Sequence, residues 1–203
     1  MNRIDLDALT EADIRARLSS RDIIPPDEPP RANIFNRPRR RAGVLIPFTR
    51  IGGAWHLLFI RRSEFEDDHH GGQVAFPGGG TEAGDADILA TALREAREET
   101  GLRPEDVRIL GRLNDLLSIT NYLVSPVVAA FDSPYPFTAD NAEVARIFTI
   151  PLAWLADPDN LRAETRENPG EGSWPILYYD LYDGELLWGF TAGLTQRLLN
   201  VLR

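Results

Sequence analysis

The chain has 203 residues, of which 43% are hydrophobic and 26% charged, and its formal net charge is −9. This composition is typical of an ordinary globular protein, and the acidic balance argues against a general nucleic-acid binder, which presents a basic face. Because the chain has no cysteine, disulfides, thiolate catalysis and zinc–thiolate sites are excluded, and we expect a cytoplasmic protein. No apolar run reaches membrane-span length and no signal-peptide core is present, so we expect no membrane association.

The first 36 residues are predicted to form an extension ahead of the main domain at residues 37–203. Thr10-Glu11-Ala12-Asp13 resembles a capping box and predicts a short amphipathic helix within residues 4–19. Residues 24–30 then read Ile-Pro-Pro-Asp-Glu-Pro-Pro, which forbids regular structure and predicts an extended linker. The alternative for this segment is a proline-rich ligand for a partner domain.

A dense basic cluster precedes the first predicted strand and consists of Arg37, Arg39, Arg40 and Arg41. Apolar strands are predicted at residues 42–47 and 55–60, and Arg61 and Arg62 follow the second of them. These arginines are either solvated charges at loops and strand ends or ligands of substrate phosphates, which arginine binds bidentately. We take Arg41, Arg61 and Arg62 as the candidate substrate-binding residues.

Residues 73–76 predict a short strand that leads into a glycine turn at Pro77-Gly78-Gly79-Gly80. Upstream, His69 and His70 precede two glycines, which suggests a metal site. Because no partner ligand stands at a recognised spacing, we interpret both as exposed or structural histidines.

A helix that ends at Gly101 is predicted to carry three carboxylates. At about 100° per residue, Glu95 and Glu99 project about 40° apart, and Glu98 lies roughly 60° further round. A mostly apolar stripe runs beside them and consists of Leu89, Ala92, Leu93, Ala96 and Thr100. Because this stripe is expected to pack on a core, the glutamates are expected at the wall of a cleft.

Three like charges this close repel each other, so an opposite charge is needed to offset them. A divalent cation with oxygen ligands does so, and Mg²⁺ is usually shared between protein carboxylates and substrate phosphates. The alternative is a solvated acidic helix face, since glutamate is a good helix former and Arg–Glu pairs are common on helices. The glycines upstream favour the metal, because they let backbone carbonyls approach a ligand closely.

Three strands are predicted beyond this helix, at residues 107–110, 116–119 and 123–131. Pro126 predicts that the third of them is an edge strand or carries a bulge, because proline donates no ladder hydrogen bond.

The C-terminal part of the chain mixes helices and strands. A helical turn is predicted at residues 140–146, and a helix begins at 150–155 with Pro151 in its first turn. The remaining predicted elements are strands at 175–182 and 185–187 and a helix at 190–202. Strands mixed with flanking helices predict an α+β sandwich.

The spacing of Gly80 and Arg94-Glu95-x-x-Glu98-Glu99-x-Gly101-Leu102 resembles the signature of the Nudix hydrolases. The glutamate that this family carries between the glycine and the arginine falls on Ala86, which Asp85 and Asp87 flank. In the family, that glutamate mainly supports the loop and its arginine. The departure therefore bears on the loop geometry more than on metal binding.

The resemblance implies a Nudix-type α/β/α sandwich with a mixed sheet, here with an N-terminal helical extension. It implies a Mg²⁺ or Mn²⁺ ion and puts this metal on Glu95, Glu98, Glu99 and the carbonyl of Gly79. The three glutamates and Arg94 are the candidate catalytic residues. Arg94 is expected to orient the carboxylates through an ion pair, and Glu98 either binds the metal or deprotonates the attacking water.

Segments outside the signature are similar to the coenzyme A pyrophosphatases of this family. The main one is Leu57-Leu58-x-x-Arg61-Arg62-Ser63 followed by residues 72–79, and the similar stretches together cover roughly residues 41–195. One departure lies in residues 63–71, where the subfamily carries an arginine and this chain has acids and histidines. If that arginine holds the nucleotide part of coenzyme A, its replacement weakens the coenzyme A assignment.

We therefore expect a small-molecule nucleoside diphosphate derivative as substrate, with coenzyme A first and ADP-ribose, NADH or a dinucleotide as alternatives. From coenzyme A, the resemblance implies 3′,5′-ADP and 4′-phosphopantetheine as products. A non-catalytic nucleotide-binding module is a third interpretation, although such modules usually lack one or more of the glutamates. A homodimer is left open, and Glu143 is a weaker candidate for the general base.

Overall fold

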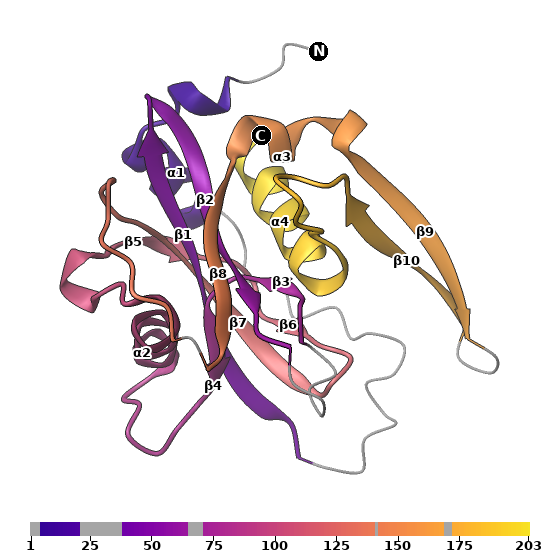
Figure 1. The fold of residues 1–203 in the computed structure, drawn as a ribbon, viewed down its shortest axis with the longest axis horizontal. Coiled ribbons are helices and arrows are strands. Elements are labelled where there is room, and N and C mark those ends of the chain that lie inside the picture. The colour runs from indigo at the N-terminus through magenta and orange to yellow at the C-terminus, as the bar shows by residue number, and fades with distance from the viewer. Residues whose placement is uncertain (1–4, 21–37, 65–70, 141, 169–171) are drawn as a thin grey trace.

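The structure, a computed structural model, describes residues 5–20, 38–64, 71–140, 142–168 and 172–203. Among these residues, a mixed sheet of eight strands lies between helices on its two faces (Figure 1). The predicted linker at residues 24–30 lies outside the described residues, as do Arg37, His69 and His70. Of the described helices, none has the length and apolar character needed to cross a membrane.

The sheet is organised around two long antiparallel strands, β1 (Arg40–Ile51) and β2 (Ala54–Arg62). They pair with each other only next to their connecting turn and then separate. β3 (Val74–Ala75) pairs with β2, and β4 (Gly78–Gly80) pairs with β1, so these two short strands lie in the gap. The predicted glycine turn is therefore wrong: the three glycines form a strand, because β1 leaves its backbone groups open where it has separated from β2.

β7 (Tyr122–Ala130) is an interior strand. It runs parallel to β1, while its other edge pairs with β5 (Arg108–Arg112) and β6 (Leu116–Leu117). The edge position predicted from Pro126 is therefore wrong, although the β5–β7 ladder does contain an irregular register. The proline is tolerated because it lies between the last pair of β5 and the first pair of β6, where no ladder donor is needed.

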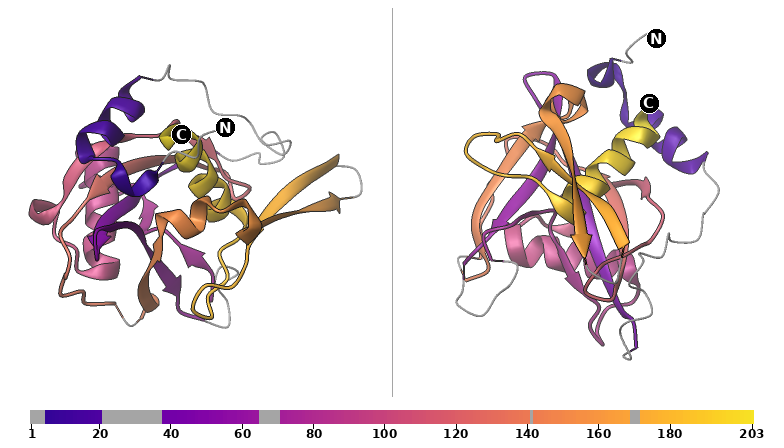
Figure 2. Two further views of the ribbon diagram at one scale, coloured as in Figure 1. Left: turned by 90° about the horizontal axis from the view of Figure 1, so that it is seen from above. Right: turned by 90° about the vertical axis from the view of Figure 1, so that its right-hand side faces the viewer.

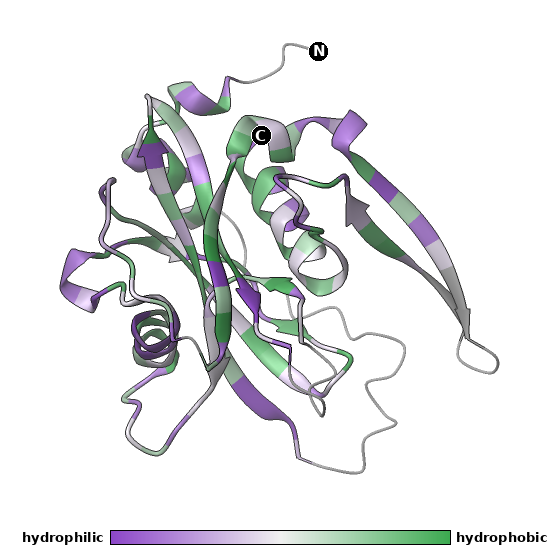
Figure 3. Ribbon diagram, viewed as in Figure 1, coloured by the Kyte–Doolittle hydropathy of each residue, from purple (hydrophilic) through white to green (hydrophobic). Residues whose placement is uncertain are grey.

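Helices cover both faces of the sheet. α2 (Ile88–Thr100) packs on one face, over a buried cluster that includes Leu45 and Val127. α1 (Glu11–Ser19), α3 (Leu152–Ala156) and α4 (Gly189–Leu202) pack on the other face, over a larger cluster. Apolar residues follow the central strands and α4, whereas α2 also carries strongly polar ones (Figure 3). The predicted α+β sandwich with a mixed sheet is confirmed.

The N-terminal segment packs onto this same core. A short 3₁₀ turn (Leu6–Ala8) precedes α1, which begins with the predicted capping box between Thr10 and Asp13. Ile14 and Leu18 of α1 are buried in the cluster that also contains the apolar residues of α4. The segment therefore shares the core of the rest of the chain, and the boundary after residue 36 stays a prediction.

β8 (Val144–Pro151) pairs with β2 and was not predicted from the sequence. The carbonyl of Asp140 accepts hydrogen bonds from the backbone nitrogens of Glu143 and Val144, and the helical turn predicted at residues 140–146 does not extend to Arg146, because β8 begins at Val144. Pro151 is the N-cap of α3 instead of a first-turn residue, and the helix predicted at 190–202 is α4. Further 3₁₀ turns lie at Pro104–Asp106 and Pro158–Asn160.

A separate two-stranded sheet, β9 (Leu161–Asn168) and β10 (Gly172–Tyr179), projects from the main body (Figures 1 and 2). β10 corresponds to the strand predicted at 175–182. The strand predicted at 185–187 is reduced to isolated bridges, in which Tyr178 pairs with Trp188 and Tyr182 with Glu185.

Candidate active site

Two carboxylates of α2 lie against the glycine strand β4. A Cβ atom on Gly79 would stand 2.7 Å from Oε2 of Glu95 and 2.5 Å from its carboxyl carbon, so any side chain there would displace the carboxylate. Glu99 lies one helical turn further on, and its Oε2 accepts a hydrogen bond from the backbone nitrogen of Gly78 (2.9 Å). Glycine in β4 is therefore what lets these carboxylates reach the backbone.

The register between β1 and β4 decides which backbone groups face β1. Leu45 N donates to Pro77 O (2.8 Å), and Thr81 N donates to Arg41 O (3.0 Å). Since bonded pairs alternate along an antiparallel ladder, Gly79 also falls in a bonded position. Its carbonyl is therefore directed at β1.

Gly78 and Gly80 fall in the alternate positions, so their polar groups point away from β1. Gly78 N binds Glu99, and Gly80 O accepts a hydrogen bond from Nη2 of Arg94 (3.0 Å). The carbonyl predicted as a metal ligand at Gly79 is engaged by the ladder, whereas those of Gly78 and Gly80 point to the side where the glutamates lie.

Arg94 is the centre of an ion cluster at the start of this site. Its Nε and Nη2 donate to the two oxygens of Asp85 (3.0 and 3.1 Å), and its Nη1 donates to Glu95 (3.0 Å) and Glu98 (2.9 Å). Asp85 also accepts from Glu82 N (2.9 Å), and these donors hold the pKa of Asp85 well below its usual range.

Asp85 thus supports the arginine and its loop, which is the role that the family resemblance assigns to the glutamate replaced by Ala86. The sequence placed Asp85 beside that position without predicting this contact. Asp87, its neighbour, caps α2 by accepting from Ala90 N (2.8 Å). The loop around Ala86 is therefore held by two acidic residues: Asp85 binds Arg94, and Asp87 caps α2.

The three glutamates differ in burial. The side chains of Glu95 and Glu98 are 15% and 57% exposed, and Glu99 is buried. Burial raises the pKa of Glu99 to about 8 against the hydrogen bond from Gly78, and it also raises the pKa of Glu95. One buried and one partly buried carboxylate, in both of which the ionised form is disfavoured, make this a site where a cation would be stabilised.

Arg62 and Arg61 were predicted together as substrate-binding residues, and the structure separates them. Adjacent residues of a strand point to opposite faces. Arg62 faces α2, where its Nη1 lies 3.6 Å from Oε1 of Glu99, while Arg61 lies 3.7 Å from Glu185 on the other face. Arg41 is exposed at the start of β1. Of the three, Arg62 alone has a described ion pair with one of the glutamates of α2.

Glu143 lies close to the same site. Its backbone oxygen accepts from Ser63 N (2.8 Å), directly after Arg62, and its negative charge contributes to the raised pKa of Glu95 and Glu99. On the outer side of α2, Arg94 and Glu98 line an open groove of about 630 Å³. The candidate site is thus bounded by β4, α2 and the turn before β8.

The donor set suits a hard divalent cation, since it offers the carboxylates of Glu95, Glu98 and Glu99 and the outward carbonyls of β4. Within the described ranges, no three acidic or histidine side chains already group around a common point, and Arg94 binds both Glu95 and Glu98. A metal held by all three glutamates therefore requires Glu98 to leave Arg94, which its exposure permits.

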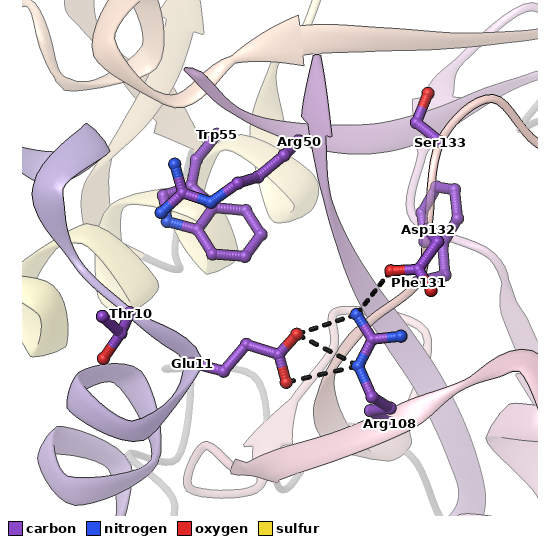
Figure 4. Close-up of a pocket in the computed structure, with 8 residues that line it drawn as sticks. All are labelled: Thr10, Glu11, Arg50, Trp55, Arg108, Phe131, Asp132 and Ser133. Atoms are coloured by element: carbon purple, nitrogen blue, oxygen red, sulfur yellow. Dashed lines mark hydrogen bonds and ion pairs between the residues drawn. The ribbon is translucent and has the colours of Figure 1, made fainter. Parts of the chain in front are cut away.

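A second hollow, of about 460 Å³, lies near the opposite end of β1 (Figure 4). Arg50 is seven residues from Gly43, or roughly 23 Å along the strand at about 3.3 Å per residue. Here Arg108 binds Glu11 (2.8 Å) and Asp132 (2.9 Å), and Arg15 also lies 3.6 Å from Glu11, so two cations offset two acids. This hollow lacks the uncompensated carboxylates of the candidate site.

A family model described as the NUDIX domain matches residues 38–168, which contain β4, α2 and β8. The uncharacterized Nudix hydrolase NudL of Citrobacter koseri is 36% identical over 83% of this chain and 86% of its own length. The NudL protein of Escherichia coli is 35% identical with the same coverage of both chains.

Two solved structures have similar folds. RenU, a Nudix hydrolase from M. smegmatis, aligns with a TM-score of 0.55 at 20% identity, over 81% of this chain and 86% of that one. A MutT/nudix family protein from Enterococcus faecalis aligns with a TM-score of 0.52 at 14% identity, over 95% of this chain and 69% of that one. At these identities the likeness concerns the fold.

Proposed function

The chain belongs to the Nudix hydrolase family, whose members act on nucleoside diphosphate derivatives, and we propose that it hydrolyses the diphosphate of such a compound with Mg²⁺ or Mn²⁺. Coenzyme A is the leading substrate, with 3′,5′-ADP and 4′-phosphopantetheine as products. The observation that carries the proposal is the placement of Glu95 and Glu99 against the glycine backbone of β4, beside an arginine anchored by Asp85.

Glu95, Glu99 and an outward carbonyl of β4 are the proposed ligands of the main ion, and Glu98 joins them or accepts the proton of the attacking water. A divalent ion held by these groups would neutralise the diphosphate and would lower the pKa of a bound water. Glu98 suits either role because its side chain is the most exposed of the three and lies on the same helix as the other two. Glu143 is the second candidate for the base, since its charge acts on Glu95 and Glu99.

Arg94 is proposed as a positioning residue. It binds Asp85 with two nitrogens and holds Glu95 and Glu98 with a third, so it fixes the position of these carboxylates. Arg62 is the proposed ligand of a substrate phosphate, because it stands at the ion site and arginine binds phosphate bidentately. Arg41 is kept as a second phosphate ligand, whereas the pairing of Arg61 with Glu185 weakens the same role for Arg61.

The coenzyme A assignment is tested by product analysis. Purified protein with Mg²⁺ is given coenzyme A, ADP-ribose, NADH and a dinucleotide in parallel, and the products are separated by chromatography. Formation of 3′,5′-ADP from coenzyme A at the highest kcat/KM supports the assignment. A higher kcat/KM for another compound replaces it, and calorimetric binding without any product supports a non-catalytic module.

The site assignment is tested by Glu98→Gln and Glu99→Gln. Each variant keeps the size of the side chain but removes a charge that faces the proposed ion, so kcat should fall by about 10²–10³. Turnover that survives both changes within about tenfold overturns the assignment.

A cytoplasmic location and a homodimer belong to this proposal as well. Sedimentation of the purified protein tests whether it is a dimer.

A further inference from the structure

Arg40, at the start of β1, rests on an aromatic ring at the start of β7. Its guanidinium carbon lies 4.6 Å from the centre of the Tyr122 ring. The backbone nitrogen of Arg40 donates to Asn121 O (3.2 Å), and Ser118 binds both the nitrogen (3.0 Å) and the oxygen (2.8 Å) of Tyr122. Both members of the pair are therefore held in place by the backbone of their strands.

This stacking leaves the hydrogen-bonding capacity of Arg40 available. A guanidinium over a tyrosine ring is attracted by the π-electrons of the ring, and this contact pairs none of the N–H donors of the arginine with an oxygen acceptor. Arg40 is exposed, and among the described residues no carboxylate forms an ion pair with it, in contrast to Arg94 and Arg108. In a chain of net charge −9, a fixed arginine of this kind is suited to an anionic ligand.

The pair lies directly beside β4. A Cβ on Gly80 would stand 3.8 Å from Nη2 of Arg40 and 3.9 Å from Tyr122, while a Cβ on the preceding Gly79 would meet Glu95. Since consecutive Cα atoms are about 3.8 Å apart, the guanidinium of Arg40 and the carboxylate of Glu95 lie within roughly 12 Å of each other. That separation is about the length of one nucleotide.

The two groups are on opposite faces of β4, which is short. The strand ends at Gly80, and at its outer edge, among the described residues, Gly78 N binds Glu99 and Gly80 O binds the anchored Arg94. An extended ligand that passes the end of β4 can therefore reach the glutamates with one part and Arg40 with another.

We propose that Arg40, seated on Tyr122, is a specificity-determining residue that binds a phosphate of the substrate other than its diphosphate. The inference rests on the proposed function, because it takes the diphosphate to lie at Glu95 and Glu99. It narrows the substrate class to nucleoside diphosphate derivatives that carry an additional phosphate on the nucleoside. Tyr122 is a positioning residue, because it acts on this phosphate through Arg40.

The test compares substrates that differ by one phosphate: coenzyme A against dephospho-coenzyme A, and NADPH against NADH. Arg40→Gln should raise KM for the phosphorylated member of the pair by about 10- to 100-fold, the value of one charged hydrogen-bonding contact, and leave kcat within threefold. KM for the member without the phosphate should stay within threefold. Arg197→Gln, an exposed arginine on α4 with the same change of charge, serves as the control.

Tyr122 is tested by a conservative pair. Tyr122→Phe keeps the ring and should match the wild type, whereas Tyr122→Leu should reproduce part of the KM effect of Arg40→Gln on the phosphorylated substrate. Thermal unfolding of each variant identifies any loss of folding.

The outcomes separate this inference from the proposed function. If the wild type turns over the substrates but Arg40→Gln changes KM equally for both members of a pair, or for neither, the role of Arg40 is overturned and the hydrolase assignment stands. If the wild type with Mg²⁺ hydrolyses none of the four compounds, the proposed function itself fails, and the inference fails with it. A selective KM effect supports both.

Discussion

Two ion clusters of this protein, each centred on an arginine, differ in how deeply their carboxylates are buried. Arg108 on β5 binds Glu11 of α1 and Asp132, whose side chains are 29% and 87% exposed. These acids are partly solvated, and the cluster joins the N-terminal helix to the sheet. Such a cluster serves stability, and each of its ion pairs contributes only modestly because water screens it.

Around Arg94 the acids outnumber the cations and are more deeply buried. Asp85, Glu95 and Glu98 all bind this one arginine, and the buried Glu99 lies beside them with only Arg62 opposite it. Burying uncompensated charge costs stability, and shifted pKa values of this kind concentrate at functional sites. The Arg108 cluster thus joins two segments, whereas the excess of carboxylates around Arg94 supports the proposal that this cluster binds a cation.

Among the changes that test this comparison, the largest expected effect concerns the contact between β4 and Glu95. Gly79→Ala places a methyl group against the carboxylate and displaces it, so kcat/KM should fall by about 10²-fold, as expected when a reacting geometry shifts by about 1 Å. Gly84→Ala, in the following loop, is the matched control, because a Cβ there meets nothing within 4 Å. Steady-state kinetics on both variants checks the prediction, and equal activity in the two contradicts it.

A somewhat smaller loss is expected when Arg94 loses its anchor. Asp85→Ala removes the two bonds between the guanidinium and Asp85, and loss of such outer supports typically costs 10- to 100-fold in activity or metal affinity. Titration of Mg²⁺ against kcat/KM measures it. Glu82→Ala is the control, since Glu82 is 70% exposed and 3.8 Å from Arg94, and it should retain activity within threefold.

At the other cluster the effect should appear in stability and not in turnover. Arg108→Gln removes a two-oxygen contact with Glu11, so the free energy of unfolding should fall by about 1 kcal/mol. Denaturant unfolding measures the change, and kcat/KM should stay within twofold. Asp132→Asn, at an 87% exposed side chain, should change neither quantity. A loss of activity without loss of stability in Arg108→Gln would mean that the two clusters are coupled.

The last expected effect is a pH dependence of stability. Burial raises the pKa of Glu99 from 4.5 to about 8, so between these values the folded metal-free protein holds a proton that the unfolded chain has released. Its free energy of unfolding should therefore fall as the pH rises from about 4.5 to 8. Mg²⁺ binds the ionised carboxylate, so it should raise Tm more at pH 9 than at pH 6.

The comparison of wild type with Glu99→Gln isolates this effect. The pKa of His56 is lowered by burial, and this gives the opposite slope near pH 6 in both proteins. The difference in Tm between the two proteins should therefore change with pH in the direction expected for Glu99. A difference that stays constant from pH 5 to 9 contradicts the prediction.

The local elements of the site were largely predictable from the sequence. The helix with its three glutamates ends where Gly101 adopts a left-handed conformation (φ 74°), and the capping box of α1 forms as predicted. These features depend on residues within a few positions of each other, so a short stretch of chain suffices to determine them. The spacing of the signature likewise identified Arg94 and the glutamates, because residues three and four apart share a helix face.

Only the tertiary structure decided what these elements face. Whether Gly78–Gly80 form a turn or a strand depends on β1 having separated from β2, and the β1 residues with which they pair lie more than thirty positions upstream. Alternation along β2 already implies that Arg61 and Arg62 point to opposite faces of the sheet. It does not tell which of the two faces is covered by α2.

The interior position of β7 and the anchoring of Arg94 by Asp85 likewise arise from pairing and packing between distant or irregular segments. The sequence by itself determined the helix and the chemical groups that it carries. The pairing of strands determined which of those groups meet, because hydrogen-bond register between remote segments is set by the whole sheet and by no local pattern.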